Sequence, residues 1–239
     1  MQRPTTPLIF TAFLFVVAIM SSAFSNARPT CKNFILNTYL YVGLSFLVIA
    51  FAATHVDLVD TDKTIASLGG LFAIFICTLL IIFAIHATSN VFLSHVLWVL
   101  FSILLGMILY PAIQQSSSDT ISMALIGTII MMLIFCGIVF FKPDLVSLSW
   151  GSTLLVCLIV VLVVMILNIF IGNRSSSKVI SGIVLLLFSF FLMYDTKRIM
   201  VLSKQCDITT SPPNYPKESM GFILDALNIF VSLMNLQSF

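Results

Sequence analysis

The sequence predicts an all-α protein that crosses a membrane about seven or eight times. Hydrophobic residues make up 60% of the 239 residues and charged residues only 8%, whereas about 25% of residues are charged in ordinary soluble domains. The apolar residues also occur in continuous blocks of about 20, the length that a helix needs to cross the hydrocarbon core of a bilayer. A soluble domain of this size cannot cover its surface with so few charges.

Short polar loops separate the apolar blocks, and each block is an expected helix. In chain order the blocks are residues 8–24, 34–56, 65–85, 91–113, 121–141, 148–171, 179–199 and 220–236. We expect residues 1–33 to form an N-terminal hydrophobic segment and residues 34–239 to form a seven-helix transmembrane domain. The longest loop, residues 200–219, contains Pro212, Pro213 and Pro216, so a continuous helix is not expected there.

The basic residues predict the orientation of the seven-helix domain, because cytoplasmic loops carry an excess of Lys and Arg. Seven of them fall on the side where the domain begins: Arg28, Lys32, Lys142, Lys197, Arg198, Lys204 and Lys217. Three fall on the other side: Lys63, Arg174 and Lys178. The count places the loop over residues 200–219 in the cytoplasm.

The N-terminal segment has two interpretations. Arg3, the apolar run and the small residues at 25–27 are typical of a cleaved signal peptide. Cleavage would, however, leave Arg28 and Lys32 on the translocated side and invert the predicted orientation. An uncleaved extra helix is therefore favoured. A single Arg in an apolar run does not fit a mitochondrial presequence, which is rich in Arg.

The net charge and the cysteine spacing give no indication of a nucleic-acid partner, a cofactor or a metal site. A net charge of +2 gives no reason to expect nucleic acid, and no cofactor motif is present. The five cysteines follow no metal or redox spacing; they are Cys31, Cys77, Cys136, Cys157 and Cys206. Three of them lie inside apolar blocks, where a buried reduced thiol is expected.

Two aspartates stand inside apolar blocks. Asp195 lies four residues before the expected end of its helix, and Asp225 lies five residues after the expected start of the next one. The chain leaves and re-enters the membrane on the same side, so both carboxyls are expected roughly 6–8 Å below that face at about 1.5 Å per residue. A carboxylate in hydrocarbon costs about 3 kcal/mol and usually faces a polar interior. The alternative is that each aspartate reaches the interface or pairs with Lys197 or Arg198.

The two carboxyls are therefore candidates for an ion-sensing pair. Close together in a partly dry site, they cannot easily both ionise, so one should hold a proton near neutral pH. Such a pair can release its proton to a hard cation that prefers oxygen ligands, such as calcium. Asp195 and Asp225 are the candidate gating residues and calcium ligands.

A polar stripe follows one face of the last expected helix. Its members recur at intervals of three and four residues: Glu218, Gly221, Asp225, Asn228, Ser232 and Asn235. This spacing places them on a single helical face. We interpret the stripe as the wall of a pore, with Gly221, Asn228, Ser232 and Asn235 as lining candidates beside Asp225. Polar contact between packed helices is the alternative.

The motifs around the two aspartates resemble the signature of the transmembrane Bax-inhibitor-motif family, which includes the Bax inhibitor and Lifeguard proteins. The matching segments are SFFLMYDTKRI at residues 189–199 and LDALNIF at residues 224–230. Weaker matches are YLYVGL at 39–44, LGMILYP at 105–111 and LNIF at 167–170. The resemblance implies a bundle in which six helices surround the last, and the family's di-aspartyl sensor matches Asp195 and Asp225.

The resemblance also implies a function. Family members are pH-sensitive calcium leak channels, and several suppress apoptosis. The expected partners are the calcium ion, membrane lipid and membrane proteins of the cell-death machinery. An intracellular membrane, ER or Golgi, is favoured over the plasma membrane. Two departures affect gating: Leu105 stands where the family commonly has Glu, and the helix over residues 65–85 carries no Arg, so a basic latch found in some members is missing.

Two other classes of function compete with a channel. Intramembrane aspartyl proteases also place Tyr-Asp opposite an aspartate, but they need Gly-x-Gly-Asp at the second site and a later Pro-Ala-Leu. Here the second site reads GFILD at residues 221–225 and Pro-Ala-Leu is missing. A rhomboid-type Ser/His site would need a Gly-x-Ser-Gly nucleophile, and the three histidines form no cluster. We therefore expect no enzyme. A membrane interaction protein that binds partners without conducting stays the other alternative.

Overall fold

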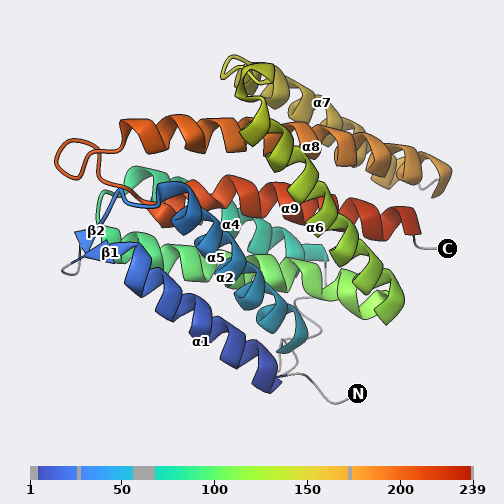
Figure 1. Cartoon of the computed structure of the whole chain (residues 1–239). Helices are drawn as coiled ribbons and strands as arrows, with labels where there is room; N and C mark the ends of the chain where they lie inside the picture. Colours follow the sequence, from blue (N-terminus) through green and yellow to red (C-terminus); the bar gives the residue numbers. More distant parts are fainter. Residues whose placement is uncertain (1–4, 26–27, 56–67, 172–173, 238–239) are drawn as a thin grey trace. The chain divides into compact units, whose positions relative to one another are not determined.

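A computed structural model describes residues 5–25, 28–55, 68–171 and 174–237, and its architecture is all-α (Figure 1). The long helices are α1 (Thr5–Ser22), α2 (Phe34–His55), α4 (Leu68–Ala87), α5 (Val91–Gln115), α6 (Ser118–Phe141), α7 (Trp150–Ile171), α8 (Arg174–Gln205) and α9 (Tyr215–Gln237). The short elements are β1 (Phe24–Ser25), β2 (Arg28–Pro29) and the 3-10 turn η2 (Pro143–Leu145). Among the described residues, seven helices, from α2 onward, are long and apolar enough to cross a membrane, and α1 is a shorter apolar helix. The predicted polytopic helical protein with an extra N-terminal helix is confirmed.

The chain forms two compact units. One comprises Met1–Gln115 with Gln205–Met220, and the other comprises Ser116–Lys204 with Gly221–Phe239. Helix α9 begins in the first unit and continues in the second. The predicted boundary between residues 33 and 34 falls at the start of α2, inside the first unit. The division of the chain into an N-terminal segment, residues 1–33, and a seven-helix domain, residues 34–239, stays a prediction.

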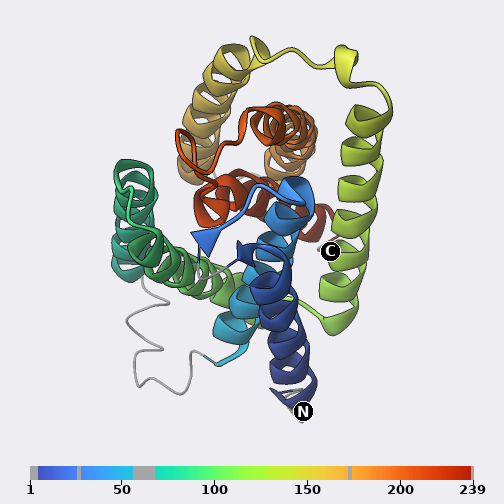
Figure 2. The same ribbon diagram turned by 60° about the vertical axis from the view of Figure 1, so that its left-hand side comes forward.

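In the first unit α1 packs against α2, α2 against α5, and α5 against α4 (Figure 2). Gly43 makes the first of these contacts possible, because a Cβ atom at this position would overlap the ring of Phe15. At the end of α1, Ser22 Oγ donates a hydrogen bond of 2.6 Å to Asn37 Oδ1. The N-terminal helix is thus an integral part of the unit.

Aromatic and polar side chains of the first unit fix the first turn of α9. The Tyr41 hydroxyl lies 2.6 Å from His95 Nε2, and Trp98 Nε1 donates a 3.1 Å hydrogen bond to Ser219 Oγ. Tyr41 stacks on Tyr215 with ring centroids 5.7 Å apart. These contacts join α2, α5 and the start of α9. His95 is half-buried, and the other four residues are buried.

The connection between α8 and α9 is shorter than predicted. Helix α8 continues to Gln205 and α9 begins at Tyr215, so the predicted loop over residues 200–219 was too long at both ends. Residues 200–205 read MVLSKQ, in which Met, Leu, Lys and Gln are good helix formers, and they extend α8 to Gln205. Pro216 occupies the second position of α9, where a missing N–H costs nothing. Pro212 and Pro213 lie in the connection, as predicted.

In the second unit, α6, η2, α7 and α8 are joined by buried contacts, and the rest of α9 lies with them. Val139, Val146 and Met193 form a buried apolar cluster between α6, the segment after η2 and α8. Gly127 of α6 leaves room for Leu233 of α9, whose Cδ1 would lie 2.9 Å from an added Cβ. In the most apolar stretch of α9 61% of the residues are buried, against 6% in α7. The burial of α9 agrees with the expected interior helix, whereas most side chains of α7 are exposed.

Candidate functional site

The site is built on a short segment of α8 whose consecutive side chains contact different neighbours. The Tyr194 hydroxyl would lie 2.7 Å from a Cβ atom added at Gly151, so this tyrosine packs closely on the start of α7. Thr196 Oγ1 lies 3.3 Å from the sulfur of Cys136 in α6. Successive residues of a helix are rotated by about 100°, so Asp195, between these two, points in a third direction.

Lys197 completes this segment and is engaged away from the aspartates. Its Nζ donates a 2.8 Å hydrogen bond to the carbonyl oxygen of Pro143 at the start of η2. This contact ties α8 to the turn that connects α6 and α7. The predicted alternative of an ion pair between Lys197 and an aspartate is therefore not the arrangement that the structure shows.

Asp195 meets α9 at Gly221. A Cβ atom added at Gly221 would overlap Oδ2 of Asp195, so only glycine leaves space for this carboxyl against the helix backbone. Asp225 follows Gly221 by one helical turn and lies on the same face of α9. Both residues are buried, with 8% of Asp195 and 4% of Asp225 exposed, and the two carboxyls interact electrostatically. The structure thus brings the two predicted residues together.

The two aspartates occupy matched positions along their helices. Asp195 is ten residues before the end of α8 at Gln205, and Asp225 is ten residues after the start of α9 at Tyr215. At 1.5 Å per residue each aspartate is about 15 Å from its helix end. The predicted depth of 6–8 Å below the membrane face refers to the membrane rather than to the helix ends, and it stays a prediction.

The two carboxyls have unequal surroundings. Arg198 NH1 lies 3.9 Å from Asp195 Oδ1, one turn along the same helix. The predicted alternative of an aspartate paired with Arg198 is therefore present for Asp195, although the contact is long for an ion pair. Asp225 Oδ2 is fully buried and accepts no hydrogen bond from the residues that the structure describes. Asp225 is therefore the more isolated carboxyl of the pair.

The remaining lining candidates lie at different levels of α9. Ser232 is buried and Asn228 is half-buried, with its Nδ2 donating a 2.8 Å hydrogen bond to Leu224 O. Asn235 is exposed near the end of the helix. The opposite, apolar face of α9 is buried as well; Ile223 and Ile229 are inaccessible to solvent. The polar stripe exists as predicted from the spacing, and its role as a pore wall stays a prediction.

The pair supplies few ligands for a cation. Within the described ranges of the chain no group of three or more His, Cys, Asp or Glu side chains could hold a metal ion, whereas calcium takes six to eight oxygen ligands. The Oδ1 atom of Asn228, one turn beyond Asp225, is a further acceptor because its Nδ2 is used by the backbone. Backbone carbonyls or water would complete the shell. The described side chains at this site therefore supply fewer oxygen ligands than calcium takes.

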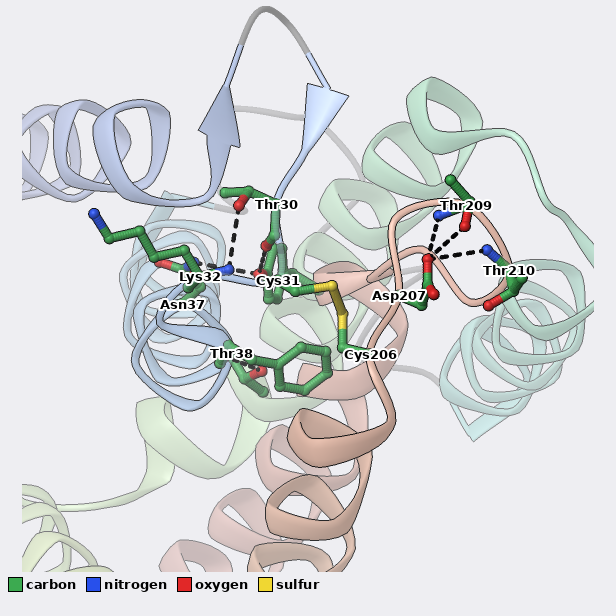
Figure 3. Close-up of a disulfide and its surroundings, with 11 residues drawn as sticks. Thr30, Cys31, Lys32, Asn37, Thr38, Cys206, Asp207, Thr209 and Thr210 are labelled. Carbon is green, nitrogen blue, oxygen red and sulfur yellow. Dashed lines mark hydrogen bonds between the residues drawn. A yellow bond between two sulfur atoms is a disulfide. The ribbon is translucent and has the colours of Figure 1, made fainter.

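Sequence reasoning missed a covalent link. Cys31 and Cys206 form a disulfide between residues 175 apart in the chain, with Cα atoms 5.8 Å apart (Figure 3). The cysteines follow no local redox spacing, and a bond across so long a sequence separation leaves no local signal, so it was not predicted. Two facts could have indicated it: both residues lie outside the apolar blocks, and both fall on the same predicted face of the membrane.

Comparison with known proteins settles the family. The model of the family described as "Inhibitor of apoptosis-promoting Bax1" matches residues 31–238. The chain belongs to this family. The match includes both aspartate motifs and every helix from α2 to α9, so it confirms the resemblance seen in the sequence.

The curated relatives are bacterial membrane proteins. "Modulator of FtsH protease YccA" of Escherichia coli K12 is 27% identical over 210 residues, which are 85% of this chain and 88% of the relative. "Inner membrane protein YccA" of Escherichia coli O6:H1 matches with the same identity and coverage. A membrane protein of Vibrio cholerae is 27% identical over 205 residues, 84% of this chain and 86% of its own length. This chain is thus a YccA-like multi-pass membrane protein.

Proposed function

We propose that this protein is a pH-sensitive calcium leak channel in which Asp195 and Asp225 form the gate. The observation that carries the proposal is the placement of the Asp195 carboxyl against Gly221, one turn from the buried Asp225. Burying ionisable carboxyls inside a membrane protein costs free energy, so carboxyls retained there usually have a function. Proton and calcium binding are the chemistry that such a pair offers.

The gate works through the charge of the pair. When the two carboxyls share a proton, a hydrogen bond between them holds α8 against α9. When both are ionised, like charges repel unless a cation bridges them. Calcium therefore competes with protons for the same oxygen atoms, and acid suppresses its passage.

The experiment is calcium flux into liposomes that contain the purified full-length protein, with an internal calcium indicator. We expect flux above that of protein-free liposomes, and flux that rises between about pH 6 and pH 8 as the pair loses its proton. Flux equal to that of protein-free liposomes at both pH values would contradict the proposal.

The second candidate is a regulator that binds a membrane protease. It is favoured by the relative named as a modulator of FtsH protease, which this chain matches over most of its length. Co-expression with an FtsH-type protease and a membrane substrate tests it. Slower degradation that persists in Asp225→Asn would indicate partner binding that does not need the carboxyl pair.

The remaining features of the proposal follow from the family and the site. We propose a non-enzymatic role, because GFILD at residues 221–225 lacks the glycine directly before the aspartate that aspartyl proteases use. We place the protein in a bacterial-type inner membrane rather than the ER or Golgi membrane expected from the sequence, since the named relatives are bacterial. Inhibition of apoptosis, by acting on calcium or on cell-death proteins, is supported by the family description alone.

A further inference from the structure

The disulfide joins two segments of the first unit that flank membrane helices. Cys31 lies between β2 and α2, three residues before α2 begins, and Cys206 is the first residue after α8. Both are half-buried, so reagents can reach them. Because Cys206 opens the segment over residues 206–214 that connects α8 to α9, the bond ties this connection to the start of α2.

The segments on either side of the bond have their own hydrogen bonds (Figure 3). Lys32 N donates to Thr30 Oγ1 at 3.2 Å, and Asn37 Nδ2 donates to Lys32 O at 2.9 Å. These contacts shape the turn before α2 without help from the sulfur atoms. Opening the disulfide therefore does not require this turn to unfold.

The connection after Cys206 is also shaped locally. Asp207 Oδ1 accepts hydrogen bonds from the hydroxyl and the backbone N–H of Thr209, at 2.6 and 2.7 Å. These bonds, with weaker ones from Thr210, hold the pKa of the Asp207 carboxyl below its usual range. Residues 207–211 are exposed. What the disulfide adds is attachment of this compact turn to α2.

The side of the membrane on which the disulfide lies determines whether it is expected to be permanent or reversible. The Lys and Arg count places this face in the cytoplasm, where glutathione and thioredoxin keep thiols reduced and disulfides are transient. The same face carries seven basic residues against three on the other. A permanent disulfide does not fit this compartment, whereas a reversible one does.

We propose that Cys31 and Cys206 are a redox modification site at the cytoplasmic face, which fastens the α8–α9 connection to α2 when it is oxidised. In closing, the two thiols lose two protons and two electrons. The electrons pass to a low-molecular-weight disulfide such as oxidised glutathione, which leaves as two thiols. Reduced glutathione or a thioredoxin reopens the bond by the reverse exchange. This cysteine site does not require the protein to conduct ions.

The test uses the full-length protein in inverted membrane vesicles, whose cytoplasmic face is outside, with impermeant oxidised or reduced glutathione. Free thiols are counted by the mass shift with a maleimide-polyethylene glycol, and trypsin cleavage at the exposed Lys204 is followed in parallel. We expect open thiols in vesicles prepared without added oxidant and without any thiol-blocking reagent, closure by oxidised glutathione, and cleavage that is several-fold slower in the closed form, since attachment restrains the end of α8.

Matched variants assign the effect to this pair. Cys206→Ser and Cys31→Ser should each abolish closure and the slower cleavage, whereas Cys157→Ser, an exposed free cysteine in α7, should preserve both. Failure of the pair to close under oxidised glutathione would overturn the proposal. So would a bond that is already closed in cells and opens only to reductant added to vesicles of the opposite orientation, because it would then be a permanent link in an oxidising compartment.

Discussion

Replacing Asp225 with asparagine is expected to abolish the calcium dependence of ion flux while the fold stays intact. The two side chains have the same shape, and Asp225 Oδ2 accepts no hydrogen bond from the described residues, so the amide disturbs little. One of two anionic ligands is lost, however, and the like-charge repulsion that opens the pair disappears with it. We expect calcium affinity to fall by about 10- to 100-fold, or about 1.4–2.8 kcal/mol.

The control for this variant is Asp207→Asn, which makes the same chemical change at a fully exposed carboxyl outside the helices. It should leave calcium dependence unchanged. Thermal unfolding of both variants in detergent shows whether the fold is retained. If flux and its pH dependence are unchanged in Asp225→Asn and in Asp195→Asn, the carboxyl pair is not the gate.

Gly221→Ala is expected to destabilise the protein, although it adds only one methyl group. That methyl would overlap Oδ2 of Asp195, which is buried between α8 and α9. Either the carboxyl or the helix backbone must move, and such overpacking costs about 1–3 kcal/mol. We expect a lower unfolding temperature and loss of pH-dependent flux, because the pair no longer meets.

A matched control lies on the facing helix. At Gly182 of α8 an added Cβ would have no atom within 4 Å, so Gly182→Ala should be neutral or slightly stabilising. The double variant Gly221→Ala with Asp195→Ala should recover stability, since removing the carboxyl makes room for the methyl group. A Gly221→Ala protein that unfolds at the wild-type temperature would show that the close contact is not as described.

Most of the fold follows from the sequence because hydrophobic block length is a strong signal in membrane proteins. The starts of α2 and α5 were predicted to the residue, as was the end of α6. The end of α8 was missed by six residues, since the prediction stopped at Ile199. The next residues, 200–205, read MVLSKQ, in which Met, Leu, Lys and Gln are good helix formers, so the helix continues.

The site was predictable only in part. Charged residues inside apolar blocks identified Asp195 and Asp225, and chain direction gave their matched position. The role of Gly221 as the space for Asp195 depends on how α8 packs on α9, which no periodicity reveals. The Cys31–Cys206 bond joins the two ends of a 175-residue separation, and it depends on tertiary structure alone.

The most direct test of the carboxyl pair as a proton-controlled calcium gate is the calcium affinity of the purified protein as a function of pH, in the wild type and in Asp195→Asn. Since calcium binds best when both carboxyls are ionised, we predict that wild-type affinity rises between about pH 6 and pH 8. Asp195→Asn should show weaker binding with little dependence on pH. Wild-type affinity that is flat across this range, or a rise that is equally steep in Asp195→Asn, would contradict the account.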